Sequence, residues 1–219
     1  MKNIYSLAGM ALLTLSLSQQ AQADVLVNTG DPSGNGYFPS TLDGTDWVAA
    51  QFTISQDQYI NSIQGYLIDN GNAEVGNTFT ITVYDSNPSS SSSNSIPAIN
   101  VNTANQEFTG DATFTGNGWN GLSGINNNAG FFLAAGTYWV AFEIGNNGNN
   151  DSFQGAMPVS TSTPLAAYAA YSGGSYYNYS SAPGNDIGVQ ISSVPVPPSV
   201  LLFVSGLFAV GRFGKRKAS

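Results

Sequence analysis

The feature that most restricts the fold is a two-residue alternation of apolar and polar side chains in several short segments. Between Val48 and Ile54 every second residue is apolar, and the residues in between include Gln51 and Thr53. A strand places successive side chains on opposite faces of a sheet, so this alternation predicts strands with one buried face. We expect strands at Val25–Val27, Val48–Ser55, Tyr59–Asp69, Thr78–Val83, Glu107–Thr115, Thr137–Ile144 and Ile187–Ile191.

Polar stretches rich in Gly, Asn and Ser separate the expected strands. We expect three of them to be surface loops, at Ser86–Ser95, Asn117–Gly130 and Gly145–Asp151. Between the two ends of the chain, only Ala166–Tyr171 shows a weak helical period. Seven or more short strands joined by turns predict an all-β fold, an antiparallel β-sandwich of jelly-roll type, with its first and last strands close together.

The first 23 residues have the order of a secretory signal peptide. Lys2 precedes an apolar segment, Ile4–Leu17, and Ala21 and Ala23 form an A-x-A site before Asp24. This order predicts an N-terminal signal helix that signal peptidase removes, so that the exported chain begins at Asp24. A first transmembrane helix is the alternative, and the apolar segment is short for one.

The end of the chain, residues 194–219, combines three elements in order. A Pro-rich motif comes first and an uncharged apolar run, Val200–Gly211, follows it. Twelve helical residues at about 1.5 Å each reach roughly 18 Å, against about 30 Å of hydrocarbon, so flanking residues must extend the span. We expect a short transmembrane helix over residues 200–213, with the basic tail 212–219 on the cytoplasmic side. An ordinary C-terminal anchor has the same geometry and stays open. The basic residues that stop the span are Arg212, Lys215, Arg216 and Lys217.

This order of elements resembles the PEP-CTERM sorting signal of Gram-negative bacteria. The VPLPA variant, with a Phe-x-Ser-Gly-Leu core in its helix, is the nearer match, and this chain has that core at residues 203–207. Val196 stands where the PEP form has an acidic residue, Pro198 replaces the variant's Ala, and Arg212 interrupts the late helix. The matching motif is Val194, Pro195, Val196, Pro197 and Pro198.

The resemblance implies a route for the protein. It implies recognition by an exosortase-type membrane protease, cleavage near the motif, transient residence in the inner membrane, and delivery to the cell surface or an extracellular polymer matrix. The stretches Ala49–Thr53 and Leu133–Trp139 also look like the β-sandwich domains that PEP-CTERM proteins often carry. We therefore expect a signal peptide at residues 1–23, a β-sandwich ectodomain at 24–193 and a sorting signal at 194–219.

The expected ectodomain contains no cationic side chain. All five Lys and Arg residues lie in the two terminal segments, and all thirteen Asp and Glu residues lie between Asp24 and Asp186. Binding to nucleic acid is excluded, because that affinity comes from Lys and Arg at the phosphates. The chain has no Cys and no His, which excludes disulfides, thiolate or imidazole catalysis, and zinc sites built on those residues.

Two groups of residues are candidates for ligand binding. Asp31, Asp43 and Asp46 occupy a Gly-rich stretch that could wrap a calcium ion, although Asp in such a stretch also forms ordinary turns. Exposed aromatic rings beside Asn and Asp suit sugar rings, but several of these rings could instead pack into the sandwich, as we expect for Trp47 and Trp139. The candidate stacking residues are Trp119, Tyr176, Tyr177 and Tyr179, in a group with Tyr168 and Tyr171.

These features predict a secreted, surface-sorted structural or adhesive protein of the cell envelope or exopolysaccharide matrix, and not an enzyme. The alternative is a calcium-dependent carbohydrate-binding module with a defined glycan pocket. A glycoside hydrolase comes last. Such an enzyme needs two carboxyl groups about 5 to 9 Å apart, but Glu74, Glu107 and Glu143 lie in no recognisable motif.

Overall fold

The computed structural model describes residues 23–32, 40–86, 106–145, 150–159, 165, 167–172, 175–179 and 187–194. These residues form strands and no helix, and Val25–Val194 is one compact unit. The all-β prediction is confirmed for this part of the chain. The strands are β1 (Val25–Asn28), β2 (Ser40–Leu42), β3 (Trp47–Ile54), β4 (Gln58–Leu67), β5 (Thr78–Asp85), β6 (Gln106–Thr113), β7 (Gly118–Ser123), β8 (Phe131–Leu133), β9 (Gly136–Glu143), β10 (Gly155–Met157), β11 (Tyr168–Ser172), β12 (Ser175–Tyr179) and β13 (Val189–Ser193).

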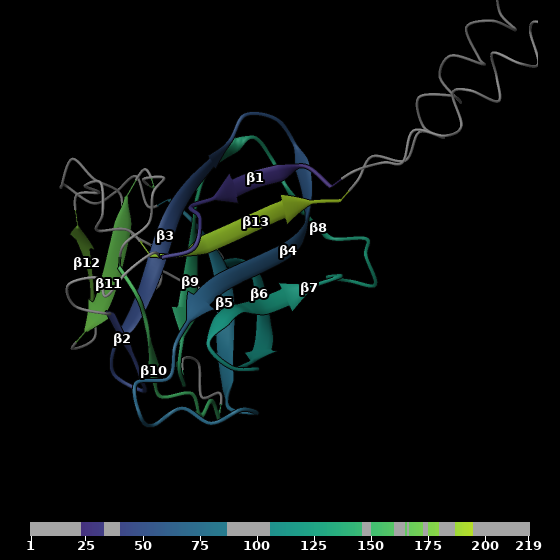
Figure 1. The fold of residues 1–219 in the computed structure, drawn as a ribbon. Helices are drawn as coiled ribbons and strands as arrows, with labels where there is room; N and C mark the ends of the chain where they lie inside the picture. The colour runs from purple at the N-terminus through teal and green to yellow at the C-terminus, as the bar shows by residue number, and fades with distance from the viewer. Residues whose placement is uncertain are drawn as a thin grey trace, which may run out of the picture. The chain divides into compact units, whose positions relative to one another are not determined.

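Two antiparallel sheets face each other in a β-sandwich (Figure 1). The five-stranded sheet has the order β1-β13-β4-β7, and β8 pairs with the beginning of β4. The six-stranded sheet has the order β12-β11-β3-β9-β5-β6, and β10 and β2 form a separate two-stranded sheet. β1 pairs with β13, which confirms that the first and last strands lie side by side.

Apolar side chains from both sheets form one continuous core. A Cβ atom at Gly65 of β4 would lie 2.6 Å from the Phe142 ring of β9 and 2.9 Å from Met157 Cε, so the two sheets approach closely at this glycine. Burial of this layer supplies the main favourable term in folding. Its strand members include Val48, Phe52, Ile54, Ile60, Ile63, Leu67, Phe79, Ile81, Val83, Val140, Phe142, Val189 and Ile191.

Strands β5 and β9 of the six-stranded sheet are buried on both faces over most of their length, which differs from the half-buried strands that the alternation predicts. Trp139, Ala141 and Glu143 of β9 lie on the face away from the core and are fully buried. Trp139 and Ala141 belong to a second apolar cluster on that face, with Ala49 of β3 and Tyr84 of β5. Ala side chains and two large rings, Trp139 and Tyr84, form this second layer, which the alternation of the inner faces does not reveal.

The expected loop at Asn117–Gly130 is wrong in its first half, which forms β7 against β4. A Cβ atom at Gly121 would collide with the carbonyl oxygen of Ile63, so the close approach of these two strands requires glycine. The glycine-rich composition that predicts a loop here therefore includes the residue that allows β7 to pair with β4. The second half does form turns, with positive φ at Asn126, Asn127 and Asn128.

The weak helical period at Ala166–Tyr171 does not correspond to a helix, because Tyr168–Ser172 is strand β11. It pairs with β3 on one side and β12 on the other, and the Tyr171 ring stacks on Trp47 with centroids 4.0 Å apart. Trp47 and Trp139 are both buried, as expected. The short strands β2, β8 and β10 have only three residues each, too few for a periodic signal.

Most of the terminal signals lie outside the described residues. Ala23, Asp24 and Val194 are described, but Ala21, residues 195–198, the apolar run and the four basic residues are not. The two predicted terminal helices therefore stay predictions, as do the loops over residues 87–95 and 146–149. Within the described part of the chain, no helix is long and apolar enough to cross a membrane.

Close packing at Gly65 predicts a large response to one methyl group. We expect Gly65→Ala to destabilise the fold by about 1–3 kcal/mol, because the new Cβ overlaps the Phe142 ring and the core must shift. Chemical denaturation followed by circular dichroism measures the change. Gly44→Ala is the matched control, because nothing lies within 4 Å of a Cβ at Gly44 and stability should not fall. Equal stability of both variants would contradict the packing described above.

Candidate functional site

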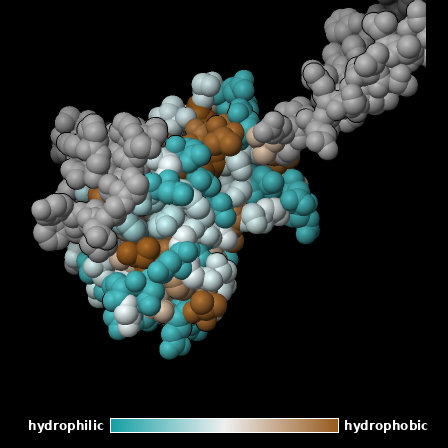
Figure 2. All heavy atoms as spheres, in the orientation of Figure 1, coloured by the Kyte–Doolittle hydropathy of each residue, from teal (hydrophilic) through white to brown (hydrophobic). Residues whose placement is uncertain are grey.

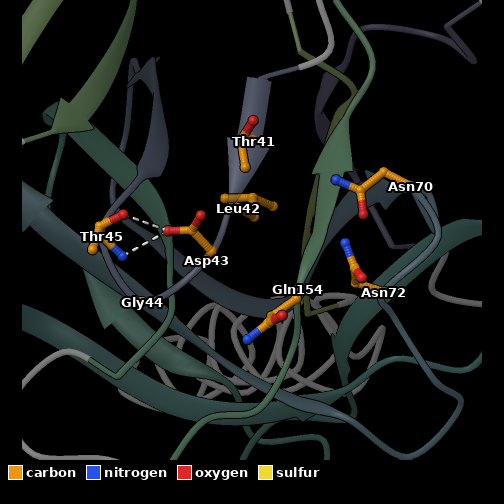
Figure 3. A pocket seen from close by; sticks show the side chains of 8 residues that line it. All are labelled: Thr41, Leu42, Asp43, Gly44, Thr45, Asn70, Asn72 and Gln154. Carbon is orange, nitrogen blue, oxygen red and sulfur yellow. Dashed lines mark hydrogen bonds between the residues drawn. The ribbon is translucent and has the colours of Figure 1, made fainter.

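A polar pocket of about 270 Å³ lies at the end of the sandwich where β4 finishes (Figure 3). Its walls come from β2 and the turn after it, from the loop after β4, and from the segment before β10. Most of these side chains are exposed, whereas Leu42 is buried below them. The lining residues are Thr41, Leu42, Asp43, Gly44, Thr45, Asn70, Asn72 and Gln154.

Strand pairing brings these distant segments together. Leu42 of β2 lies opposite Gly155 of β10, and Ile68 forms a bridge with Ala156 just after β4. The Asn70 side chain donates a hydrogen bond of 3.4 Å to the carbonyl of Gly155. Gln154 therefore lies beside the β4 loop, although 84 positions separate it from Asn70 in the sequence.

Asp43 organises the turn on one side of the pocket. Its Oδ1 atom accepts hydrogen bonds from Thr45 N at 2.7 Å, Thr45 Oγ1 at 2.7 Å and Asp46 N at 3.0 Å. Burial raises the pKa of the Asp43 carboxyl, but these three bonds to the charged form outweigh burial, so its pKa lies below the ordinary value. The pocket therefore contains a carboxylate at neutral pH.

Asp69 organises the loop on the other side. Its Oδ1 atom accepts bonds from the backbone N–H groups of Gly71, at 2.6 Å, and Ala73, at 2.9 Å. The Ala73 and Gly71 bonds lower the pKa of Asp69, and Gly71 has a φ of 105°, which favours glycine. This tight loop presents Asn70 and Asn72 to the pocket, opposite the Asp43 turn (Figure 3).

The set of groups in the pocket is suited to a ligand rich in hydroxyl groups. Amide side chains from Asn70, Asn72 and Gln154 both donate and accept, Thr41 and Thr45 add hydroxyls, and Asp43 accepts only. A hydroxyl group of a sugar also donates and accepts, so these groups can satisfy it in either role. The pocket is slightly smaller than those that enclose a drug-sized ligand, roughly 300–1,000 Å³. It therefore fits a single sugar unit better than a long chain.

The three Asp residues predicted for calcium do not converge. Thr45 Oγ1 donates to Asp43 Oδ1 and also to Asp46 Oδ2, at 3.2 Å, which places these two carboxylates on one turn. Asp31 instead accepts a bond of 2.6 Å from the indole N–H of Trp119. Among the described residues, no group of three or more Asp or Glu side chains is arranged to hold a metal ion.

The predicted stacking residues lie apart from the pocket. Trp119 is on β7, not in a loop, and its partly exposed ring meets the Tyr66 ring edge to face at 5.4 Å. Tyr176, Tyr177 and Tyr179 lie on β12, which pairs with β11, and their side chains are outside the described set.

The more exposed aromatic rings in the described residues are Tyr59 and Phe132, which the sequence analysis does not single out. They pair across β4 and β8. Tyr59 lies in an expected strand and Phe132 follows an expected loop. Only a prediction of which strand faces are exposed would identify these two rings.

Two of the Glu residues considered for glycoside hydrolysis, Glu107 and Glu143, lie in settings that do not suit it. Asp85 and Glu107 share a hydrogen bond, a closer approach than the separation of about 5 to 9 Å that glycosidases use. Burial, followed by the charge and hydrogen bond of Asp85, raises the pKa of Glu107. Glu143 is fully buried and accepts bonds from the hydroxyls of Thr82 and Tyr84.

Comparison with known proteins gives no family. Neither the models of known protein families nor the curated proteins contain a match to this chain. A function can therefore be inferred only from the residues of the pocket, the charge of the body and the two terminal segments.

The hydrogen bonds to Asp43 predict a pH-dependent contribution to stability. Because the folded pKa is lowered, this contribution is present above the unfolded pKa of about 3.9 and is lost as the pH falls through the folded value. Asp43→Asn should therefore cost about 1 kcal/mol near pH 7 and much less near pH 2. Thermal unfolding at the two pH values measures both differences.

Gln154→Ala is the control for Asp43→Asn, because it changes the same pocket without a titrating group. Its effect on stability should be the same at both pH values. A constant loss for Asp43→Asn across the pH range would mean that its carboxylate is not stabilised by these bonds.

Proposed function

We propose that this chain is a secreted, surface-sorted structural or adhesive protein that binds neutral polysaccharide in the cell envelope or exopolymer matrix. The observation that carries the proposal is the pocket between the Asp43 turn and the Asn70 loop, with its amide, hydroxyl and carboxylate groups. These groups recognise hydroxyls by hydrogen bonding. Binding is the proposed activity.

The charge of the body restricts the class of polymer. Thirteen carboxyl groups and no Lys, Arg or His lie between residues 24 and 193. A surface of one sign repels polymers of the same sign, so uronate-rich or phosphorylated polysaccharides should bind poorly. The proposed ligand is a neutral glycan, of which one unit enters the pocket.

The terminal segments support export and sorting. We propose that signal peptidase cleaves before Asp24 and that the Pro-rich motif from Val194, with the apolar run and basic tail, is a PEP-CTERM-type signal for an exosortase-type protease. The product would be an ectodomain of residues 24–193 at the cell surface or in the matrix of a Gram-negative bacterium. Repeated crossings between the sheets, from β3 to β4 to β5 and from β6 to β7, support a jelly-roll type of sandwich.

A calcium-dependent form of the same binding is the second proposal. Asp43 and Asp46 share one turn and Asp43 lines the pocket, so a bound cation there would contact the same ligand. Asp43 Oδ1 already accepts three hydrogen bonds and Asp31 is engaged by Trp119, so the described residues fit this proposal less well.

A glycan array with the exported form tests the pocket. We expect binding to neutral glycans. We expect the Asn70→Ala, Gln154→Ala double variant to lose at least about tenfold in affinity, because each substitution removes hydrogen bonds to the glycan worth roughly 1 kcal/mol. Asn126→Ala, an exposed amide on the β7–β8 turn, is the matched control and should bind normally.

Repeating the array in EDTA separates the two proposals. Unchanged binding supports direct recognition, whereas loss in EDTA with recovery in calcium supports the metal-dependent form. If the double variant binds like the unmodified chain, the pocket is not the glycan site.

The mass of the mature protein from its native host tests the route. We expect a product that begins at Asp24 and ends near residues 194–199, found at the cell surface or in the medium rather than in the inner membrane. Fractionation followed by intact mass spectrometry measures this. Retention of residues 200–219 in all of the product would mean an ordinary C-terminal anchor.

A further inference from the structure

Large apolar side chains are exposed together at one end of the five-stranded sheet. Val25 of β1, Tyr59 of β4 and Phe132 of β8 are 61%, 55% and 49% exposed. Tyr59 and Phe132 are direct cross-strand partners, and their rings meet edge to face at 5.4 Å. We call these three residues the exit patch. On the face that Figure 2 presents, hydrophobic surface is confined to separate patches among hydrophilic residues.

The chain leaves the sandwich beside this patch. The N–H of Val194, the last described residue, donates a bond of 2.7 Å to the carbonyl oxygen of Tyr59. A Cβ atom at Gly130 would lie only 2.8 Å from Val194 Cγ2, so Val194 packs tightly against the turn before β8. Val25 of β1 pairs with Ser192 of β13, the strand that separates β1 from β4. The point of exit is therefore fixed relative to the exposed rings.

The distance from this exit to the apolar run is short. Five residues, 195–199, separate Val194 from Val200, and three of the five are Pro. At about 3.1 Å per residue in a Pro-rich segment, the spacer reaches at most roughly 20 Å. Whenever the apolar run is in the membrane, the exit patch must lie within about this distance of the bilayer surface.

We propose that the exit patch docks on the lipid interface of the membrane that holds the C-terminal segment. This inference rests on the proposed membrane insertion of that segment. Tyr and Phe rings gain free energy at the boundary between headgroups and acyl chains, where an apolar ring and a polar tip are both accommodated. Asp24 and Asp57 lie close to the patch in the chain, and the body has no cationic side chain to attract anionic lipid, so we expect an apolar contact that prefers neutral lipid.

Docking would orient the pocket away from the membrane. Tyr59 is at the beginning of β4 and Asn70 follows its end, and ten strand residues span about 30 Å. The pocket therefore lies at the far end of the sandwich from the exit patch. A precursor held in this way presents its glycan site outward before it is released.

The exported precursor, residues 24–219 without the signal peptide, tests the proposal in phosphatidylcholine vesicles. The protein has no Cys, so Ala134→Cys, an exposed position two residues after Phe132, accepts one NBD fluorophore. We expect its emission to rise roughly twofold and shift to the blue on reconstitution, as the probe enters the interface. Val75→Cys is the matched control. Val75 is 74% exposed in the loop after β4, at the far end, and its probe should not change.

A second pair of variants assigns the effect to the rings. In the Ala134→Cys background, Tyr59→Ser with Phe132→Ser should abolish the rise, while Tyr59→Phe should keep it. Melting temperatures measured in detergent confirm that both remain folded. A rise that survives the double substitution, or an equal rise at position 75, would overturn the proposal.

Alkaline extraction of the same vesicles separates the two possible failures. A chain that resists extraction but shows no change at position 134 refutes the exit patch and leaves the proposed sorting intact. A chain that is extracted refutes the membrane segment, and the inference falls with it. A rise produced by neutral polysaccharide without vesicles would identify the patch as a glycan surface and also overturn the proposal.

Discussion

Burial of the apolar layer between the two sheets is the main stabilising interaction of this domain, because neither disulfides nor salt bridges between side chains can form in it. The chain has no Cys, and the body from residue 24 to 193 has no Lys, Arg or His that could pair with a carboxylate. The packing at Gly65, where β4 meets Phe142 of β9, shows how little free space the layer leaves. The loops that build the pocket are held in place by strands whose positions depend on this layer.

The same lack of cations explains how the carboxylates are accommodated. N–H and hydroxyl groups take the place of Lys and Arg as partners of these carboxyl groups. Backbone N–H groups donate hydrogen bonds to Asp57 and Asp69, the Trp119 indole donates to Asp31, and hydroxyls donate to Glu143. Hydrogen bonds to charged acceptors are stronger than those between neutral groups, and they fix direction as well as distance. Asp69 and a further carboxylate of this kind, Asp43, shape the two sides of the pocket.

Local sequence patterns predict those parts of the fold in which one face of a strand is apolar and the other is polar. That holds for β3, β5 and β9, whose inner faces the alternation predicts, although it does not reveal that the outer faces of β5 and β9 are also buried. It fails for β7, where Gly121 meets a neighbouring backbone, and for β11, where Ala occupies both faces. The sequence does not predict the pocket. Of its residues, only Asp43 is a predicted site residue, as a calcium ligand, since Asn70 and Gln154 come together through long-range pairing that no local pattern contains.

The position of β13 has a mechanical consequence. β13 carries the chain to its exit and is hydrogen-bonded on both edges, to β1 and to β4, while the pocket lies at the opposite end of β4. When a ligand in the pocket and the C-terminal tether are pulled apart, the load runs along the strands. Bonds perpendicular to the strands are then strained in shear, several at once, instead of being opened one after another. A domain loaded in this direction resists extension far better than one that is peeled from an edge, a property that the adhesive function proposed above would require.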